Sequence, residues 1–184
     1  MTDTADRLYE RVLVLRCQAG DEAGFAELVE RYQPRLRYFL RKMLGEVHGA
    51  EDVLQEVWLD VFRAVARLVD VGAFRAWLYR IARDRALREL RKRRPAHQPL
   101  DQDDLSDSAV EEAQFAAEDV ERIHLALDEL APEPREVLVL RYVENMTYEE
   151  IAEVQACQIG TVRSRLHYAK RALRRVIERM NVHD

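Results

Sequence analysis

The sequence predicts an all-α protein with two small helical domains joined by a flexible acidic linker, the second domain containing a helix-turn-helix. Apolar residues recur at helical spacing along most of the chain, and no run alternates as a half-buried strand would. Only 6 glycines and 5 prolines interrupt the 184 residues. The net charge of −5 hides a segregation, with cations in two helical stretches and carboxylates between them. These patterns predict domains at residues 1–95 and 119–184 and a linker at 96–118.

The first domain is expected to be a series of helices separated by short breaks. Two amphipathic segments meet at Pro34, and a break at Gly45–Ala50 follows the second of them. A helix is then expected over 51–68, and the turn Val69–Gly72 leads into a helix over 74–94. The residues expected to face inward from the 51–68 helix are Val53, Leu54, Val57, Trp58, Val61, Phe62 and Val65.

The second domain follows a segment that is too polar to bury a core. Residues 96–118 are rich in carboxylates and serine, so ordering entropy is not offset and a flexible linker is expected. Helices are then expected over VERIHLALDEL and over APEPREVLVLRYV, whose prolines suit a helix start. Thr147 and Glu150 fit a capping box, which predicts a short helix from Ile151. The turn QACQ leads into a longer basic helix, a pattern typical of a helix-turn-helix.

The second helix of this pair carries candidate DNA contacts. A major groove accommodates one α-helix, and the N-terminal end of a recognition helix faces the bases. Side chains near that end are candidate base readers, whereas cations further along are suited to phosphates. The alternative is a helical hairpin whose basic face is merely solvated. The candidate readers are Thr161, Arg163, Ser164 and His167, and the candidate phosphate contacts are Arg165, Lys170, Arg171 and Arg174.

A second basic helix, Arg80–Arg94, contains only Asp84 and Glu89 as carboxylates. Exposed arginines between apolar positions are typical of a solvated surface as often as of a nucleic-acid contact. The run lies close to the turn Val69–Gly72 and to Trp77, and aromatic rings beside cations can stack on unpaired bases. Helical spacing nevertheless favours a core position for Trp77.

No combination of residues in the sequence suggests an active site. Asp52, Gln55 and Glu56 alone indicate the solvated face of an amphipathic helix. The five histidines lack metal-ligand spacing, and no glycine-rich phosphate loop occurs. Cys17 and Cys157 form no disulfide-like pattern, and Cys157 is expected to be a small structural residue in the turn. We therefore expect no catalysis, cofactor or metal, and a cytoplasmic protein without membrane insertion.

Two blocks of the sequence, in this order along the chain, together carry a family resemblance. The first block pairs AEDVLQEVWLDVF with FRAWLYRIARDRALRELRKRR. The second block is LDELAPEPREVLVLRYVENMTYEEIAEVQACQIGTVRSRLHYAKRALRR. With the N-terminal stretch AGDEAGFAELVERYQPRLRYFL, these blocks resemble bacterial RNA polymerase sigma factors, in particular the small extracytoplasmic-function group. The resemblance covers nearly all of the chain outside the linker and the extreme ends.

The resemblance implies a role for each part of the chain. The first domain would bind core RNA polymerase through Asp52, Gln55 and Glu56. The loop Val69–Ala73 and the helix after it would melt promoter DNA and capture its minus-ten element, while the second domain would recognise the minus-thirty-five element. The protein would direct promoter-specific initiation under control of an anti-sigma factor, without being an enzyme. The implied minus-ten contacts are Arg80, Arg83, Asp84, Arg88 and Arg91, and the implied minus-thirty-five contacts are Thr161, Arg163, Ser164, Arg165, His167, Lys170 and Arg171.

Three positions depart from the usual pattern of the family. Asp84 stands where an asparagine is common, and its carboxylate would repel a nearby phosphate. Ala156 replaces a turn glycine, which predicts a turn that does not need positive φ. Tyr168 stands where an arginine often follows the histidine, which removes one phosphate or base contact.

Two other classes of protein are compatible with the residues. A DNA-binding regulator, whose N-terminal helices sense a ligand or dimerise, would bind duplex DNA without polymerase and as a dimer on paired half-sites. A helical adaptor would bind only proteins, and reversing the charges of Arg91–Arg94 would leave its function intact. Specific DNA binding by the free protein would favour the regulator.

Overall fold

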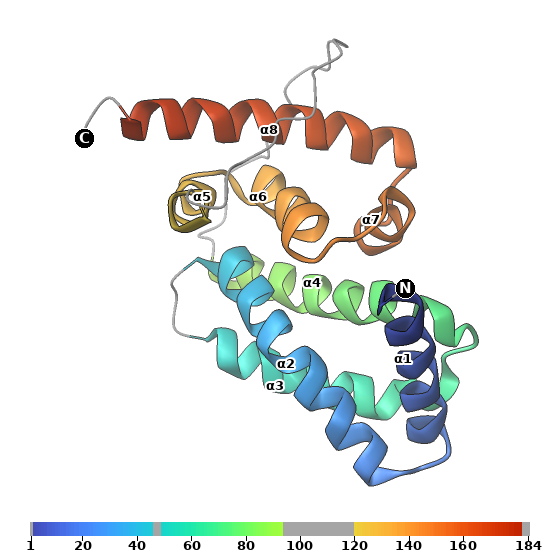
Figure 1. Cartoon of the computed structure of the whole chain (residues 1–184). Helices are drawn as coiled ribbons and strands as arrows, with labels where there is room; N and C mark the ends of the chain where they lie inside the picture. The colour runs from blue at the N-terminus through green and yellow to red at the C-terminus, as the bar shows by residue number, and fades with distance from the viewer. Residues whose placement is uncertain (1, 46–48, 94–119, 182–184) are drawn as a thin grey trace. The chain divides into compact units, whose positions relative to one another are not determined.

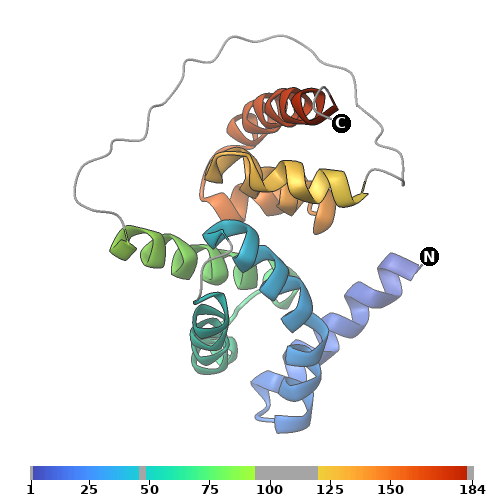
Figure 2. The same ribbon diagram turned by 90° about the vertical axis from the view of Figure 1, so that its left-hand side faces the viewer.

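The computed structural model describes residues 2–45, 49–93 and 120–181 of the chain. All regular structure in these ranges is helical, as the sequence predicts, and it divides into two compact units (Figure 1; Figure 2). The flexible linker expected at 96–118 lies outside the described residues. None of the helices in the described ranges is long and apolar enough to cross a membrane.

The N-terminal unit is built around one long helix. In chain order its described elements are α1 (Thr2–Gln18), α2 (Glu22–Leu44), α3 (Ala50–Ala64), the short 3-10 turns η1 (Val65–Arg67) and η2 (Val71–Ala73), and α4 (Phe74–Arg93). The long helix α2 packs against α1, α3 and α4, and α3 also packs against α4. The helix α1 is not predicted by the sequence pattern. This helix buries Leu13, Val14 and Cys17 but leaves Leu8 and Val12 exposed, so its apolar periodicity is indistinct.

Pro34 does not divide the second helix, although the sequence suggested two segments. The helix α2 runs without interruption from Glu22 to Leu44, with Pro34 inside it. Leu28, Tyr32, Leu36 and Phe39 on both sides of the proline form one fully buried stripe. An internal proline costs about 3 kcal/mol through a lost hydrogen bond and a clash. Burial of one continuous apolar stripe offsets that penalty, because tertiary packing provides most helical stability.

Aromatic pairs join α2 to α4 in the core of this unit. The rings of Tyr32 and Phe74 meet edge to face with centroids 5.7 Å apart. Those of Phe39 and Tyr79 meet in the same way at 5.3 Å. Such pairs contribute about 0.5–1.5 kcal/mol beyond the area they bury. They fix the rotation of α4 and so decide which of its side chains face solvent.

The C-terminal unit is a smaller group of helices around α8. Its described elements are α5 (Val120–Asp128), α6 (Pro132–Leu138), the π-helical turn η4 (Val139–Val143), α7 (Tyr148–Gln155) and α8 (Ile159–Asn181). The helix α8 packs against α5 and α6. Arg135 joins α5 to α6 by donating to the carbonyls of Asp128 at 2.8 Å and Leu130 at 2.6 Å. Burial lowers the pKa of this guanidinium.

The helix-turn-helix begins with the predicted capping box. The Thr147 hydroxyl accepts a hydrogen bond from the Glu150 amide at 3.2 Å. In return, the Glu150 carboxylate accepts one from the Thr147 amide at 2.8 Å. Two amides that the helix itself cannot pair are thereby satisfied, which fixes the start of α7.

The turn between α7 and α8 contradicts the prediction that it avoids positive φ. Ala156 has φ of 50°, the left-handed conformation that glycine adopts most easily. The amide of Cys157 donates to the Ala152 carbonyl at 3.0 Å, which closes α7 as a Schellman motif does. This closure requires a left-handed residue at position 156, so the geometry of the turn prevails over the preference of alanine. Cys157 is half-buried.

Candidate nucleic-acid interface

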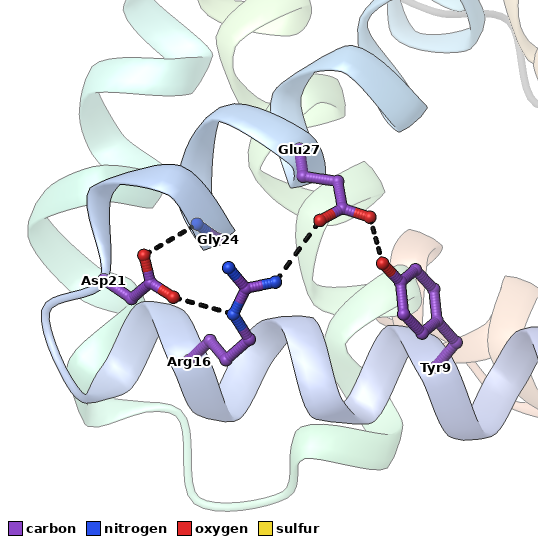
Figure 3. Close-up of polar contacts among 5 residues, drawn as sticks. All are labelled: Tyr9, Arg16, Asp21, Gly24 and Glu27. Carbon is purple, nitrogen blue, oxygen red and sulfur yellow. Dashed lines mark hydrogen bonds and ion pairs between the residues drawn. The ribbon is translucent and has the colours of Figure 1, made fainter.

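A polar network attaches α1 to α2, as Figure 3 shows. Asp21 caps α2 by accepting from the Gly24 amide at 3.1 Å and also accepts from Arg16 Nε at 2.7 Å. These hydrogen bonds, that from Gly24 first and that from Arg16 next, lower the pKa of Asp21. Arg16 also reaches Glu27 at 3.3 Å, and Tyr9 donates to the same carboxylate. A Cβ at Gly24 would lie 2.9 Å from Arg16 Cβ, so glycine permits this close approach.

The loop between η1 and η2 is held in place by hydrogen bonds on both sides of its tip. The side-chain amide of Gln18 donates to the carbonyls of Val65 at 3.1 Å and Leu68 at 2.7 Å. Asp70 accepts from the Gly72 amide at 2.8 Å, which caps η2. Between these anchors the Val69 side chain is 98% exposed. An apolar side chain is thus presented to solvent on an ordered backbone.

The helix α4 presents most of the predicted minus-ten residues as one exposed stripe. Arg80, Asp84, Arg88 and Arg91 are all exposed and lie three or four residues apart. Asp84 lies one helical turn from Arg80 and one turn from Arg88. The positive charges of these two arginines offset the repulsion that the Asp84 carboxylate would exert on a phosphate. Arg83 is half-buried and lies beside the stripe.

Trp77, for which a core position was favoured, is only half-buried. Its ring contacts that of Phe74, with the centroids 5.9 Å apart. Phe74 itself is fully buried against α2. Trp77 therefore rests on the core without entering it, and part of its ring faces solvent at the start of α4.

The helix α3 presents a stripe that is polar at one end and apolar at the other. Asp52, Gln55 and Glu56 are exposed and share one face, as predicted. The same face continues into Leu59 and Phe62, which are 52% and 62% exposed. The sequence predicted that Phe62 faces inward, and this prediction is wrong.

Phe62 lies at the border of the buried stripe of α3. It rests one edge of its ring on Phe25 of α2, with centroids 5.3 Å apart. A broad apolar stripe cannot be buried completely against two neighbouring helices, so its outermost residue remains exposed.

Arg85 connects the acidic face of α3 to the basic helix α4, and sequence analysis missed this connection. Its Nη1 lies 2.6 Å from Glu56, and its Nη2 lies 2.5 Å from Asp60. The hydrogen bond to Asp60 is the main reason that the pKa of Arg85 is raised. Arg85 is therefore engaged with α3 instead of extending the exposed stripe. The only sequence signal was its position, which is out of phase with Arg80 and Arg88.

The solvent-facing side of α8 holds the cations that are best placed for DNA. Arg163, Arg171 and Arg174 are exposed and share one face of the helix. Arg163 also lies close to Glu149 of α7. The pKa of Glu149 is lowered by its own backbone hydrogen bond, then by the Thr147 side chain, and also by the charge of Arg163. This proximity places Arg163 at the junction of the two helices.

The remaining predicted residues of α8 are held by local contacts. Ser164 donates back to the Gly160 carbonyl at 3.1 Å, and Arg165 lies 3.9 Å from Glu133 of α6. Lys170 lies over the ring of Tyr142, 5.9 Å from its centroid. Two further predicted residues, Thr161 and His167, are half-buried, and His167 Nε2 is enclosed without a hydrogen-bond partner among the described residues.

Each of the two units matches a known protein family. The Sigma-70 region 2 family matches residues 28–96, and the Sigma-70 region 4 family matches residues 120–173. The RNA polymerase sigma-H factor of Pseudomonas aeruginosa is 32% identical over 181 residues, covering 92% of this chain and 94% of that protein. The chain belongs to the sigma-70 family of bacterial RNA polymerase sigma factors. The ECF RNA polymerase sigma-E factor of Escherichia coli K12, 33% identical over 183 residues with the same coverage, indicates the extracytoplasmic-function group.

Solved structures support the same conclusion for the fold of this sigma factor. CnrH, solved with the cytosolic domain of CnrY, has a TM-score of 0.68 and 25% identity, covering 92% of this chain and 97% of that one. The Bartonella quintana RpoE, solved with the anti-sigma factor NepR, has a TM-score of 0.65 and 27% identity, covering 84% and 96%. As a sigma factor, the protein acts with core RNA polymerase in promoter-specific transcription initiation.

Proposed function

We propose that this sigma factor divides promoter recognition between its two units. Residues 1–95 engage core polymerase and the minus-ten element, residues 119–184 engage the minus-thirty-five element, and 96–118 form the acidic linker. The observation that carries the proposal is the segregation of exposed charge. One acidic stripe lies on α3, and one cationic stripe lies on each of α4 and α8. Carboxylates do not bind DNA phosphates, so the acidic stripe is free for a protein partner.

Polymerase docking is assigned to Asp52, Gln55 and Glu56. Their exposure on one face of α3 supports this assignment, and so does the adjacent apolar surface of Leu59 and Phe62. A polar rim beside exposed apolar side chains is the usual composition of a protein interface.

Capture of the minus-ten element is assigned to the loop Val69–Ala73 and the exposed side of α4. A base that leaves the stack loses a few kcal/mol of stacking and pairing, and an ordered pocket offsets this loss. The ordered backbone around Val69 supports a role in receiving such a base. The exposed cations of α4 then hold the backbone of the opened strand. The residues assigned to this element are Arg80, Arg83, Asp84, Arg88 and Arg91.

Recognition of the minus-thirty-five element is assigned to α8. Arg163 is the strongest candidate for a base edge, because it is exposed near the N-terminal end of the helix. Arg171 lies two turns further on and is better suited to a phosphate. The other residues assigned to this element are Thr161, Ser164, Arg165, His167 and Lys170.

Transcription in vitro tests the whole assignment. Core polymerase and this sigma factor are incubated with a pool of genomic fragments from the source bacterium, and transcripts are mapped. We expect discrete start sites that disappear without the sigma factor. A variant with Asp52→Lys and Gln55→Lys, which leaves the pair of Glu56 with Arg85 intact, should lose both transcription and co-purification with the core enzyme. The absence of promoter-dependent transcripts from every fragment would contradict the proposal.

We also propose regulation by an anti-sigma factor and action in the cytoplasm, without catalytic activity of its own. One of the solved structures named above, that of the Bartonella quintana RpoE, is a complex with the anti-sigma factor NepR, which supports the regulatory part. RNA polymerase acts on DNA in the bacterial cytoplasm, which supports the location. The product of a gene adjacent to that of this sigma factor should abolish the transcripts when added to the assay. If no adjacent product inhibits transcription, regulation by a neighbouring anti-sigma factor is wrong.

A further inference from the structure

We propose that α1 contributes directly to the site that captures the opened DNA strand. Gln18 positions the loop Val69–Ala73, and Arg11 supplies a cation for the backbone of the captured strand. Neither family match includes α1, since the region 2 match begins at residue 28. The proposal rests on the assignment of this loop to the minus-ten element.

Gln18 acts on the loop immediately before its exposed tip. Its amide donates to the Leu68 carbonyl at 2.7 Å, and Leu68 directly precedes Val69. A second bond, to the Val65 carbonyl at 3.1 Å, fixes the start of the same turn. Carbonyls at the end of a helical turn lack partners within it, so a side chain from another element can order them. A loop that is ordered before it binds avoids an entropic penalty on binding.

Arg11 places its guanidinium directly over the other side of the loop. A Cβ on Gly72 would lie 2.9 Å from Arg11 Nη2 and 3.3 Å from its Nε, so the guanidinium occupies the space that any larger residue would fill. No ion pair or hydrogen bond among the described residues engages Arg11, which is exposed. The nearby Asp70 carboxylate is instead bonded to the Gly72 amide. The charge therefore remains available at the loop surface.

The attachment of α1 to α2 makes this arrangement rigid. Arg16, which lies between Arg11 and Gln18 along α1, donates a hydrogen bond to Asp21 (Figure 3). Tyr9, near the start of the same helix, donates a hydrogen bond to Glu27. A strand that leaves the duplex exposes its phosphates beside the captured base. A cation carried on a helix held in this way contributes more than one on a mobile segment, because less backbone freedom is lost on binding.

The first test uses Gln18→Glu, which keeps the shape of the side chain but removes its donor. The holoenzyme is bound to a promoter fragment obtained from the transcription assay, and unpaired thymines are detected by permanganate. We expect strand opening to fall about tenfold, as for the loss of two hydrogen bonds, with core polymerase binding unchanged. Gln18→His carries an Nε2–H at a similar reach and should retain most of the opening. The positioning role of Gln18 would be overturned if Gln18→Glu opened the promoter as well as the wild type does. It would also be overturned if Gln18→Glu and Gln18→His lost strand opening to the same extent.

The second test compares Arg11→Ala with Arg7→Ala, which removes the same charge one helical turn earlier. The probe is the same promoter fragment with a pre-opened, mismatched minus-ten segment. For Arg11→Ala we expect the affinity of the holoenzyme to fall about tenfold. The slope of log affinity against log salt should also become shallower by about 0.7, as for the loss of one single-strand phosphate contact. Arg7→Ala should change neither quantity. Equal losses in both variants, or none in Arg11→Ala, would overturn the role of Arg11.

A third variant separates this proposal from the assignment of the loop. Asp70→Ala removes the cap of η2 without altering α1. If Asp70→Ala lowers opening while the Gln18 and Arg11 variants do not, the role of α1 is wrong and the loop assignment stands. If all of these variants open the promoter as the wild type does, the loop assignment itself is wrong.

Discussion

The two cationic helices of this sigma factor, α4 and α8, are held in place by different forces. Beside α4 lies the acidic helix α3, and Arg85 joins the two helices through pairs of 2.6 Å and 2.5 Å. On α8 the ion pairs of Arg165 with Glu133 of α6 and of Arg179 with Glu129, just after α5, are long, at 3.9 Å and 3.8 Å. Burial of apolar residues such as Leu166 and Leu173 holds α8 instead. Close ion pairs therefore join α4 to its neighbour, whereas the pairs of α8 are longer, and its exposed arginines are the ones that we propose contact DNA.

The two units also differ at their left-handed backbone positions. In the described part of the N-terminal unit, Gly20, Gly45 and Gly49 occupy these positions, with φ of 82°, 75° and 125°. In the C-terminal unit the corresponding residues are Asn145 and Ala156, with φ of 54° and 50°. A side chain in this conformation costs roughly 1–2 kcal/mol, although asparagine tolerates it better than alanine does. The C-terminal unit thus contains strain that the described part of the N-terminal unit avoids.

The largest effect is expected from Arg163→Ala, which removes charge from α8 without removing packing. If Arg163 contacts a base edge, the holoenzyme should lose about 1–3 kcal/mol of discrimination at one base pair of the minus-thirty-five element. The measurement is affinity for a set of promoters that carry each substitution in that element. Arg171→Ala is the matched control and should weaken binding to all of them equally. A uniform loss in Arg163→Ala would identify it as a phosphate contact.

Removal of the charge of Arg85 should instead destabilise the N-terminal unit. Arg85→Met leaves two carboxylates without their partner, and we expect the free energy of unfolding to fall by about 1–2 kcal/mol. This is less than for a fully buried pair, because a quarter of the Arg85 side chain is exposed. Both tryptophans, Trp58 and Trp77, lie in this unit, so their fluorescence during urea unfolding reports on it. Arg80→Met is the control and should lower DNA affinity without changing stability.

An equal loss of stability in Arg85→Met and Arg80→Met would contradict the contrast between the two helices. It would mean that pairing with α3 gives the charge of Arg85 no more stabilising effect than the exposed charge of Arg80 has. The comparison is informative because both variants make the same replacement, which keeps an apolar stem, and the two positions differ in whether the charge has a partner on α3.

Local signals explain the parts of the fold that the sequence predicted. The capping box of Thr147 and Glu150 depends on residues three positions apart, and the exposed stripes of α4 and α8 follow from helical spacing. The Arg85 pairs could not be predicted, because they join residues 25 and 29 positions apart that only tertiary packing brings together. The contacts of Gln18 and Arg11 with the loop have the same origin, since they join residues distant in the sequence.

Other predictions failed where tertiary packing opposed a local preference. Pro34 suggested a helix boundary, but the buried stripe on both sides of it is continuous. The apolar stripe of α3 predicted a core position for Phe62, but α3 has more apolar surface than its neighbours can cover. Ala156 suggested a turn without positive φ, but closure of α7 requires that conformation. In each case the packing or closure of the folded unit, and not the local preference of the residue, decides the structure.

A smaller effect is expected from loss of the capping box in the C-terminal unit. Thr147→Ala removes the side-chain acceptor for the Glu150 amide and should lower stability by about 1 kcal/mol. Hydrogen exchange of the α7 amides measures this change within the unit, because opening of a helix start exposes those amides. Thr161→Ala, on α8, is the control and should leave exchange in α7 unchanged. Unchanged protection of α7 in Thr147→Ala would show that the box contributes nothing to its stability.

The smallest effect, and the only stabilising one, is expected from Ala156→Gly. Glycine relieves the left-handed strain but gains freedom in the unfolded chain, so the net increase should be about 0.5–1 kcal/mol. Asn145→Gly should give less, because asparagine is already tolerant of this conformation. Protection of the α7 and α8 amides in hydrogen exchange measures both variants. Because position 156 is exposed and the turn keeps its hydrogen bond, promoter affinity should not change. If Ala156→Gly lowers the protection of these amides, alanine stabilises this turn and its left-handed conformation costs less than expected.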